Sequence, residues 1–323
     1  METRLNVMGV QVLIESGREI AFWLRNDYGR YISKDAVRPR LKFELALEKP
    51  DYAGLPKMAA SKYHEDYIVY DSRGLRLIDF FGEALSAYDT EKRSVLISCL
   101  CAQRLYEIFR LSFDSLLGEE LDRRGIHRIH CLGLEKGGAA VLVLLPPGCG
   151  KSSLALRFLG AEGIKVLSED VALFDRGRIV GLHFHWGIRK GAGRLPGRMV
   201  RRKGLPDKNF VDARTLSLAS DGRPKALILG RKVMGGESAI SPVGRHRLIL
   251  PLFKSMVLGL ELQQSLAYFL LRNYKDGFSK SGIGLSRLYA LLSVLLHSTT
   301  YEFAVGGDME ENHRVLAEFM DRL

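Results

Sequence analysis

One stretch of the chain constrains the fold more than any other. Residues 139–160 begin with an apolar run, Val141 to Leu145, that is typical of a buried strand. A short loop rich in Pro and Gly follows, and Ser153 to Leu159 then has the apolar spacing of a helix. Strand, loop and helix in this order direct backbone N–H groups toward one point at the positive end of a helix, where phosphates bind. The sequence therefore predicts a mixed α/β fold, α/β or α+β, around a phosphate-binding loop.

The loop fits most of the nucleotide-binding pattern Gly-x-x-x-x-Gly-Lys-Ser/Thr. Gly150, Lys151 and Ser152 match it, whereas Leu145 stands where the first Gly belongs. The alternative is an ordinary strand–turn–helix corner with an exposed lysine. The strand before the loop and the helix after it favour nucleotide binding. The candidate nucleotide-binding residues of the loop are Gly148, Cys149, Gly150, Lys151, Ser152 and Ser153.

Two adjacent carboxylates follow the loop at a useful distance. Glu169 and Asp170 lie 18 and 19 residues after Lys151, at the end of a short apolar stretch. A carboxylate there can hold Mg²⁺ or accept the proton of an attacking hydroxyl. Paired acidic residues are common on protein surfaces, so the pair indicates a catalytic site only in combination with the loop. We expect Lys151 to neutralise the transferred group, and the candidate Mg²⁺ ligands are Ser152, Glu169 and Asp170.

The run from His130 to Ser152 resembles the core of the bacterial HPr serine kinase/phosphorylase family, which shares its fold with PEP carboxykinases. In that family a histidine begins a strand, a β-hairpin follows, and the loop reads Gly-x-Ser-Gly-x-Gly-Lys-Ser. Glu169-Asp170 is similar to the family's Asp-Asp pair. The resemblance implies ATP and Mg²⁺ as cofactors, His130 as a catalytic helper, Asp170 as the base and Glu169 as a Mg²⁺ or structural partner.

The resemblance covers roughly residues 125–180 and has clear departures. Leu145-Pro146-Pro147 replaces the first part of the family's loop, and the later Arg-Gly-Leu-Gly signature is missing. These differences predict a divergent relative without HPr regulation. The resemblance implies a kinase for a serine or threonine hydroxyl of a peptide or protein. A small-molecule hydroxyl kinase and a non-catalytic ATP-binding regulatory module remain open as alternatives.

The positive charge of the chain gathers partly in one segment. The net charge is +11, and residues 189–203 hold seven basic residues and no acid. Such a segment can bind phosphates, an acidic peptide or nucleic acid, or it can be a solvated loop. Missing aromatic residues argue against nucleic-acid binding. We name Arg194 and Arg198 as candidates for covering the ATP phosphates.

The sequence predicts three regions. Residues 1–88 form a β-rich N-terminal region, with strands expected at 7–14, 20–24 and 41–47 and a hairpin at 67–80. A linking helix is expected over 89–122, opened by Asp89, and a kinase domain over 123–323. A single strand is expected from Ile126 to Leu134.

The location of the protein is also predicted from the sequence. Hydrophobic residues make up 46% of the chain. The N-terminal residues do not have the pattern of a signal peptide, and no apolar run is long enough for a membrane span. We therefore expect a soluble cytoplasmic protein with no membrane partner. Whether copies of the chain associate is left open.

Overall fold

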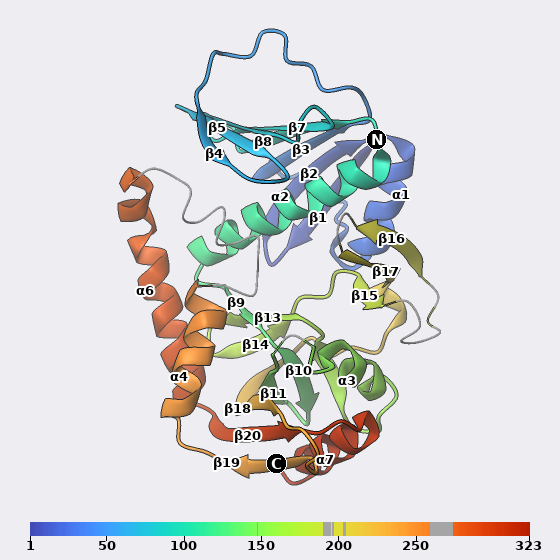
Figure 1. Ribbon diagram of the computed structural model, residues 1–323, viewed down its shortest axis with the longest axis vertical. Coiled ribbons are helices and arrows are strands. Elements are labelled where there is room, and N and C mark those ends of the chain that lie inside the picture. The colour runs from blue at the N-terminus through green and yellow to red at the C-terminus, as the bar shows by residue number, and fades with distance from the viewer. Residues whose placement is uncertain (147, 190–194, 196, 203–204, 259–273) are drawn as a thin grey trace. The chain divides into compact units, whose positions relative to one another are not determined.

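The computed structural model describes residues 1–146, 148–189, 195, 197–202, 205–258 and 274–323. The chain forms two compact units. Unit 1 comprises Met1–Leu117 and Pro196–Asp212, and unit 2 comprises Gly118–Leu195 and Ala213–Leu323. Helices and sheets occur in both, which confirms the predicted mixed α/β class (Figure 1). None of the helices in these residues is long and apolar enough to cross a bilayer.

Unit 1 is built on an eight-stranded sheet of order β1-β2-β3-β8-β7-β6-β5-β4. β3 runs parallel to β2 and β8, and the other neighbours are antiparallel. The strands are β1 (Glu2–Val7), β2 (Val10–Ser16), β3 (Leu41–Ala46), β4 (Ala60–Tyr63), β5 (Ile68–Ser72), β6 (Leu75–Asp79), β7 (Ala84–Asp89) and β8 (Ser94–Cys99). The predicted strand at 41–47 and the predicted hairpin at 67–80 are confirmed as β3 and as β5–β6.

The helices of unit 1 share an aromatic core with its sheet. The helices are α1 (Arg18–Asp27), the short 3₁₀ turn η1 (Gly29–Tyr31) and α2 (Ala102–Arg123), whose last residues belong to unit 2. Phe43 of β3 meets Phe109 of α2 edge to face, with ring centroids 5.2 Å apart, and Tyr28 meets Phe113 at 5.0 Å. The later segment of unit 1 adds the antiparallel pair β16 (Arg198–Arg202) and β17 (Leu205–Val211).

Two helix–strand assignments of unit 1 differ from those the sequence predicts. The expected helix over 89–122 begins only at Ala102, because residues 94–99 form β8. In β8, Val95 and Ile97 are buried on a strand that pairs on both sides, so alternation prevails over the helical spacing. The expected strand at 20–24 is part of α1, and the expected strand at 7–14 is the hairpin β1–β2, which turns at Met8-Gly9.

Unit 2 contains a nine-stranded sheet. Its path is β12-β10-β11-β18-β14-β13-β9, and β20 joins it by pairing with β18 and β19. β11, β18 and β20 are parallel to one another. The strands are β9 (His127–His130), β10 (Leu132–Lys136), β11 (Ala139–Leu144), β12 (Lys165–Ser168), β13 (Val171–Asp175), β14 (Arg178–Gly181), β18 (Asp221–Lys232), β19 (Ala239–Pro242) and β20 (Thr299–Val305). The expected single strand at 126–134 is interrupted at Cys131, so β9 and β10 pair with different neighbours.

Helices cover both faces of the parallel part of this sheet (Figure 1). α3 (Lys151–Phe158) and α7 (Met309–Asp321) contact each other on one face, where Phe158 and His313 have ring centroids 4.4 Å apart. The other face packs against α4 (His246–Leu252), the π-helical turn η3 (Phe253–Leu258) and α6 (Tyr274–Leu296). Short elements complete the unit: β15 (Trp186–Arg189) and η2 (Ala213–Thr215). The loop between β11 and α3 therefore lies at the carboxyl end of the parallel strands.

Candidate functional site: the loop before α3

The loop after β11 has the backbone needed to direct amides toward one point. Gly148 and Gly150 have φ angles of 83° and 79°, in the left-handed region that favours glycine. Cys149 N donates to Pro146 O at 3.2 Å, which closes the turn. Gly150 is the residue before the first turn of α3 and provides no side-chain cap. The first amides of α3 are therefore not capped from that position, and the helix dipole adds positive potential there.

The residues around this loop are closely packed. A Cβ at Gly150 would overlap Cε of Met309, the first residue of α7. Cys149 is buried, and Ser153 is half-buried in the first turn of α3. Pro147 lies outside the described residues.

Lys151 is held by two side chains from other strands. Its Nζ lies 2.5 Å from His130 Nε2 and 2.9 Å from Asp170 Oδ1. A lysine ammonium only donates hydrogen bonds, so Nε2 accepts and the proton of the neutral imidazole is on Nδ1. His130 Nδ1 is in turn 3.5 Å from Asp170 Oδ1. The three side chains form one compact group.

The pairing of β9 with β13 brings His130 and Asp170 together. His130 is opposite Val171 in this antiparallel pair, and Cys131 N donates to Asp170 O at 3.1 Å. His130 N also donates to Ser255 Oγ of η3 at 2.9 Å. The backbone around His130 is thus fixed on both sides. The side chain of Asp170 is about half exposed, so it is accessible to a second molecule.

Ser152 and Glu169 form the second contact of the site. Ser152 Oγ donates a hydrogen bond to Glu169 Oε1. A serine hydroxyl and carboxylate oxygens are the hard oxygen donors that Mg²⁺ prefers. The donor set of Ser152, Glu169 and the nearby Asp170 therefore fits Mg²⁺ by its chemistry.

A buried thiol lies next to this group. Burial raises the pKa of Cys131 to about 12, although the Lys151 charge acts in the opposite direction. Thiols react as thiolates, so Cys131 is chemically inert at neutral pH. It contributes packing next to His130.

The two arginines named from the sequence have different outcomes. Arg194 lies outside the described residues. Arg198 belongs to unit 1, where its Nη2 is 2.8 Å from Asp27 Oδ2 and its guanidinium stacks 4.6 Å from the Trp23 ring. Tyr106 Oη also donates to Asp27 Oδ2 at 2.7 Å. The charge of Arg198 is therefore already neutralised by a buried carboxylate.

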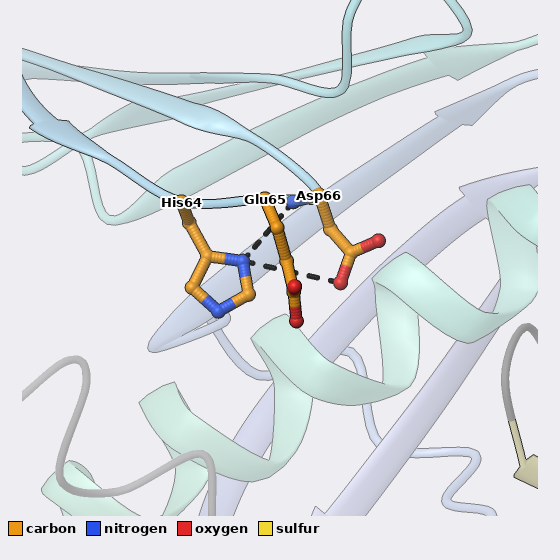
Figure 2. Close-up of side chains that lie close together, drawn as sticks. All are labelled: His64, Glu65 and Asp66. Carbon is orange, nitrogen blue, oxygen red and sulfur yellow. Dashed lines mark hydrogen bonds and ion pairs between the residues drawn. The ribbon is translucent and has the colours of Figure 1, made fainter.

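A further group of polar side chains in unit 1 offers metal-ligand atoms. His64, Glu65 and Asp66 are consecutive and exposed, with one ligand atom of each within 4.8 Å of the others (Figure 2). The His64 ring stacks on Tyr67 with centroids 4.5 Å apart, and its Nδ1 accepts from Asp66 N at 3.1 Å. These contacts orient the His64 ring without a metal.

Sequence reasoning missed two basic residues at the carboxyl end of β18. Arg231 and Lys232 end a strand that is parallel to β11, so they lie at the sheet edge where the loop begins. A signal was present, because two cations follow directly on the apolar run from Ala226 to Gly230. No sequence pattern indicates that this run pairs with β11.

The chain has no match among the comparisons made by sequence. No protein-family model matches it, and no curated protein matches it.

Proposed function

We propose that the protein is an ATP- and Mg²⁺-dependent kinase that phosphorylates a serine or threonine hydroxyl of a peptide or protein. One observation carries the proposal: Lys151 contacts Asp170, and the next residue, Ser152, contacts Glu169. Two neighbouring residues at the start of α3 thus meet two neighbouring carboxylates. Phosphoryl transfer requires a group that binds phosphate, a metal site and a base, and these four residues would supply them.

The first amides of α3 and Lys151 would bind the phosphates of ATP. Lys151 is paired with Asp170 and His130 at 2.9 and 2.5 Å. A phosphate chain competes with Asp170 for the ammonium group, so nucleotide binding would release the carboxylate. Mg²⁺ held by Ser152 and Glu169 would neutralise phosphate charge.

Asp170 would act as the base. As the acceptor oxygen bonds to the γ-phosphorus, the bond to the bridging oxygen of ADP breaks and the hydroxyl proton moves to Asp170. His130, with its proton on Nδ1, faces Asp170 Oδ1 at 3.5 Å and would keep the carboxylate in position. Its backbone is anchored by Ser255, which limits its movement.

The resemblance of residues 130–152 to the HPr serine kinase/phosphorylase family supports the same reaction. It also supports an HPr-kinase-like core for unit 2. The half-exposed Asp170 beside Lys151 favours transfer to an acceptor over nucleotide binding alone, because phosphate binding by itself does not need a second, accessible carboxylate at the lysine.

The proposal is tested by phosphoryl transfer from γ-labelled ATP with Mg²⁺ to a set of serine-containing peptides. Asp170→Asn should lower the transfer rate by about 10²- to 10⁴-fold, because it removes the base. Binding of Mg-ATP should be retained, because Lys151, Ser152 and Glu169 are unchanged and an amide at position 170 keeps one oxygen donor. The matched control is Asp175→Asn, at the far end of β13, the strand that begins directly after Asp170.

Other results would change the assignment. Equal transfer by wild type and Asp170→Asn would remove Asp170 as the base. Wild-type protein that fails to bind ATP at millimolar concentration would reject a nucleotide-dependent function. Binding without transfer to any hydroxyl would favour the regulatory module, and transfer only to small molecules would favour a metabolite kinase.

A further inference from the structure

The outer face of helix α6 is apolar where a surface helix is normally polar. Four large side chains of this face are 47–72% exposed, namely Leu285, Tyr289, Leu292 and Leu296. Their spacing of four, three and four residues places them on one stripe of the helix, like the a and d positions of a coiled coil. Between residues 281 and 296 the only charged residue is Arg287, which is buried and paired with Asp122. This part of α6 therefore lacks the polar face that a helix usually turns toward water.

Helix α4 and the turn η3 lie beside α6, antiparallel to it, and extend this face (Figure 1). Arg245 Nη2, just before α4, donates to Leu296 O at the end of α6, at 3.3 Å. Arg287 Nη1, farther back in α6, donates to Val257 O of η3 at 2.8 Å. Ile249 is one helical turn after Arg245 and therefore lies on the side of α4 that is next to α6. The exposed apolar side chains of the two helices form what we call the α4–α6 patch: Ile249, Leu250, Leu285, Leu288, Tyr289, Leu292 and Leu296.

The α4–α6 patch is larger than the apolar area that a soluble monomer usually exposes. Its side chains together expose roughly 700 Å², whereas the largest apolar patch of a typical monomer covers about 300–600 Å². A stable interface buries about 800 Å² on each partner. The patch therefore has nearly the area that one side of a dimer interface needs.

The charges around the patch distinguish between possible partners. Apart from the buried Arg287, residues 245–258 and 281–296 contain three Lys or Arg residues and no acid. Two of the three are engaged, because Arg245 donates to Leu296 O and Arg247 lies 2.8 Å from Glu302. Recognition of an anionic membrane surface typically uses a cluster of about four to eight basic residues, so this face does not fit one. An uncharged stripe with heptad spacing is instead complementary to itself, because a two-fold axis brings the same stripe of a second copy against it.

We propose that the α4–α6 patch is the interface of a symmetric homodimer. The stripe over residues 285–296 of one copy packs against the same stripe of the other, with Tyr289 near its centre. Large aromatic side chains are enriched at the centre of such interfaces. Ile249 and Leu250 extend the contact along α4. The dimer does not depend on the proposed kinase function, because α4 and α6 cover the face of the sheet opposite α3.

Sedimentation equilibrium of the full chain over about 1–100 μM tests the proposal, because interfaces of this size reach at least micromolar affinity. Wild type should be dimeric in this range. L285E/L292E should weaken association at least about tenfold, since each copy would bury two carboxylates without partners. L285M/L292M should stay dimeric, because methionine keeps the apolar volume. The matched control is L100E/M234E, which places two carboxylates at exposed apolar positions outside the patch and should associate like wild type.

Other results would overturn the dimer. Wild type that is monomeric throughout the range rejects it, as does equal association of wild type and L285E/L292E or an equal loss in L100E/M234E. Monomeric wild type that sediments with phosphatidylglycerol vesicles would assign the patch to a membrane surface. Monomeric wild type whose L285E/L292E variant unfolds at a clearly lower urea concentration would show that the patch is covered within its own chain.

Discussion

Two glycines of the loop before α3 share a backbone conformation but differ in their surroundings. Gly148 has open space where a Cβ would lie, whereas a Cβ on Gly150 would overlap Met309. We expect Gly148→Ala to lower the free energy of unfolding by about 1–2 kcal/mol, the cost of a left-handed residue with a side chain. Gly150→Ala should lower it by a similar amount, because its Cβ would meet only the flexible end of the Met309 side chain, which can move away.

Urea denaturation of the two variants measures both losses. Compared with Met309→Ala alone, Gly150→Ala with Met309→Ala should still lose the cost of the left-handed backbone. A much larger loss of unfolding free energy for Gly150→Ala than for Gly148→Ala would show that Met309 cannot move away.

Arg198 illustrates how a residue's partners decide its role. Burial raises the pKa of Asp27, and Arg198 only partly offsets this effect. Arg198→Ala should lower the free energy of unfolding by about 3–5 kcal/mol, because Asp27 keeps its buried position and loses this partner. Arg198→Lys should cost less, since it keeps the charge and loses the stacking on Trp23.

Thermal or urea unfolding, together with ATP titration, tests the role of Arg198. The control is Arg176→Ala, whose side chain is 95% exposed and should be nearly neutral. ATP affinity should not change in any of the three variants. Weaker ATP binding with unchanged stability would support the role in phosphate binding that the sequence suggests.

At the scale of elements, sequence patterns predicted what is local. The loop, the helix after it and the hairpin of β5 and β6 depend on neighbouring residues, and they were predicted. The spacing of Leu96 and Leu100 favoured a helix through this segment. Residues 94–99 instead form β8, because β3 and β7 pair with them. No local sequence pattern predicts pairing between segments that are distant in the sequence.

The same limit applies to the candidate site. His130, Lys151 and Asp170 were named from the sequence, and the structure brings them together. The position of Arg231 and Lys232 at this sheet edge could not be predicted, because it depends on the parallel pairing of β18 with β11. Arg198 was named for its charge, but its partner Asp27 is 171 residues away in the sequence.

A buried ionic cluster joins the end of α2, the start of β9 and helix α6. Asp122 accepts from His127 Nδ1 at 2.9 Å and from Arg287 Nη2 at 2.5 Å. His127 Nε2 lies 2.8 Å from Ser286 Oγ. Burial would raise the pKa of Asp122, but the hydrogen bonds from His127 and Arg287 outweigh it and hold that pKa below its usual value.

Because this pKa is lowered by folding, the ionised form of Asp122 stabilises the native state. That contribution is complete above the unfolded-state pKa and is lost as the pH falls below about 4. Asp122→Asn should lower the free energy of unfolding at pH 7 by about 3–5 kcal/mol, because Arg287 remains buried without its counter-charge. Asp122→Leu with Arg287→Met should recover part of the loss.

Urea unfolding of wild type and Asp122→Asn between pH 3 and 7 measures both effects. The difference between the two proteins should shrink toward pH 3. A constant difference over that range would show that the charge of Asp122 contributes little.

At the scale of the whole molecule, the chain passes between its two units three times. It leaves unit 1 within α2, returns for residues 196–212, and goes back to unit 2. The returning segment provides Arg198 for Asp27 and Phe210 for Arg110, whose guanidinium lies 4.6 Å from that ring. Phe210 is itself only 4% exposed. Unit 1 therefore lacks part of its core until a later segment of the chain has been added.

This topology predicts the behaviour of fragments. Residues 1–117 alone should unfold at a lower urea concentration than the same fragment joined to residues 196–212 by a Gly/Ser linker. A joined fragment with Arg198→Ala and Phe210→Ala should lose most of this increase in the urea midpoint. Identical midpoints for the short and joined fragments would mean that the first 117 residues form a complete core, and the units would then be separable by a simple cut. A clear gain means that unit 1 reaches full stability only after residues 118–195 have been synthesised, so the loop before α3 is made before unit 1 is complete.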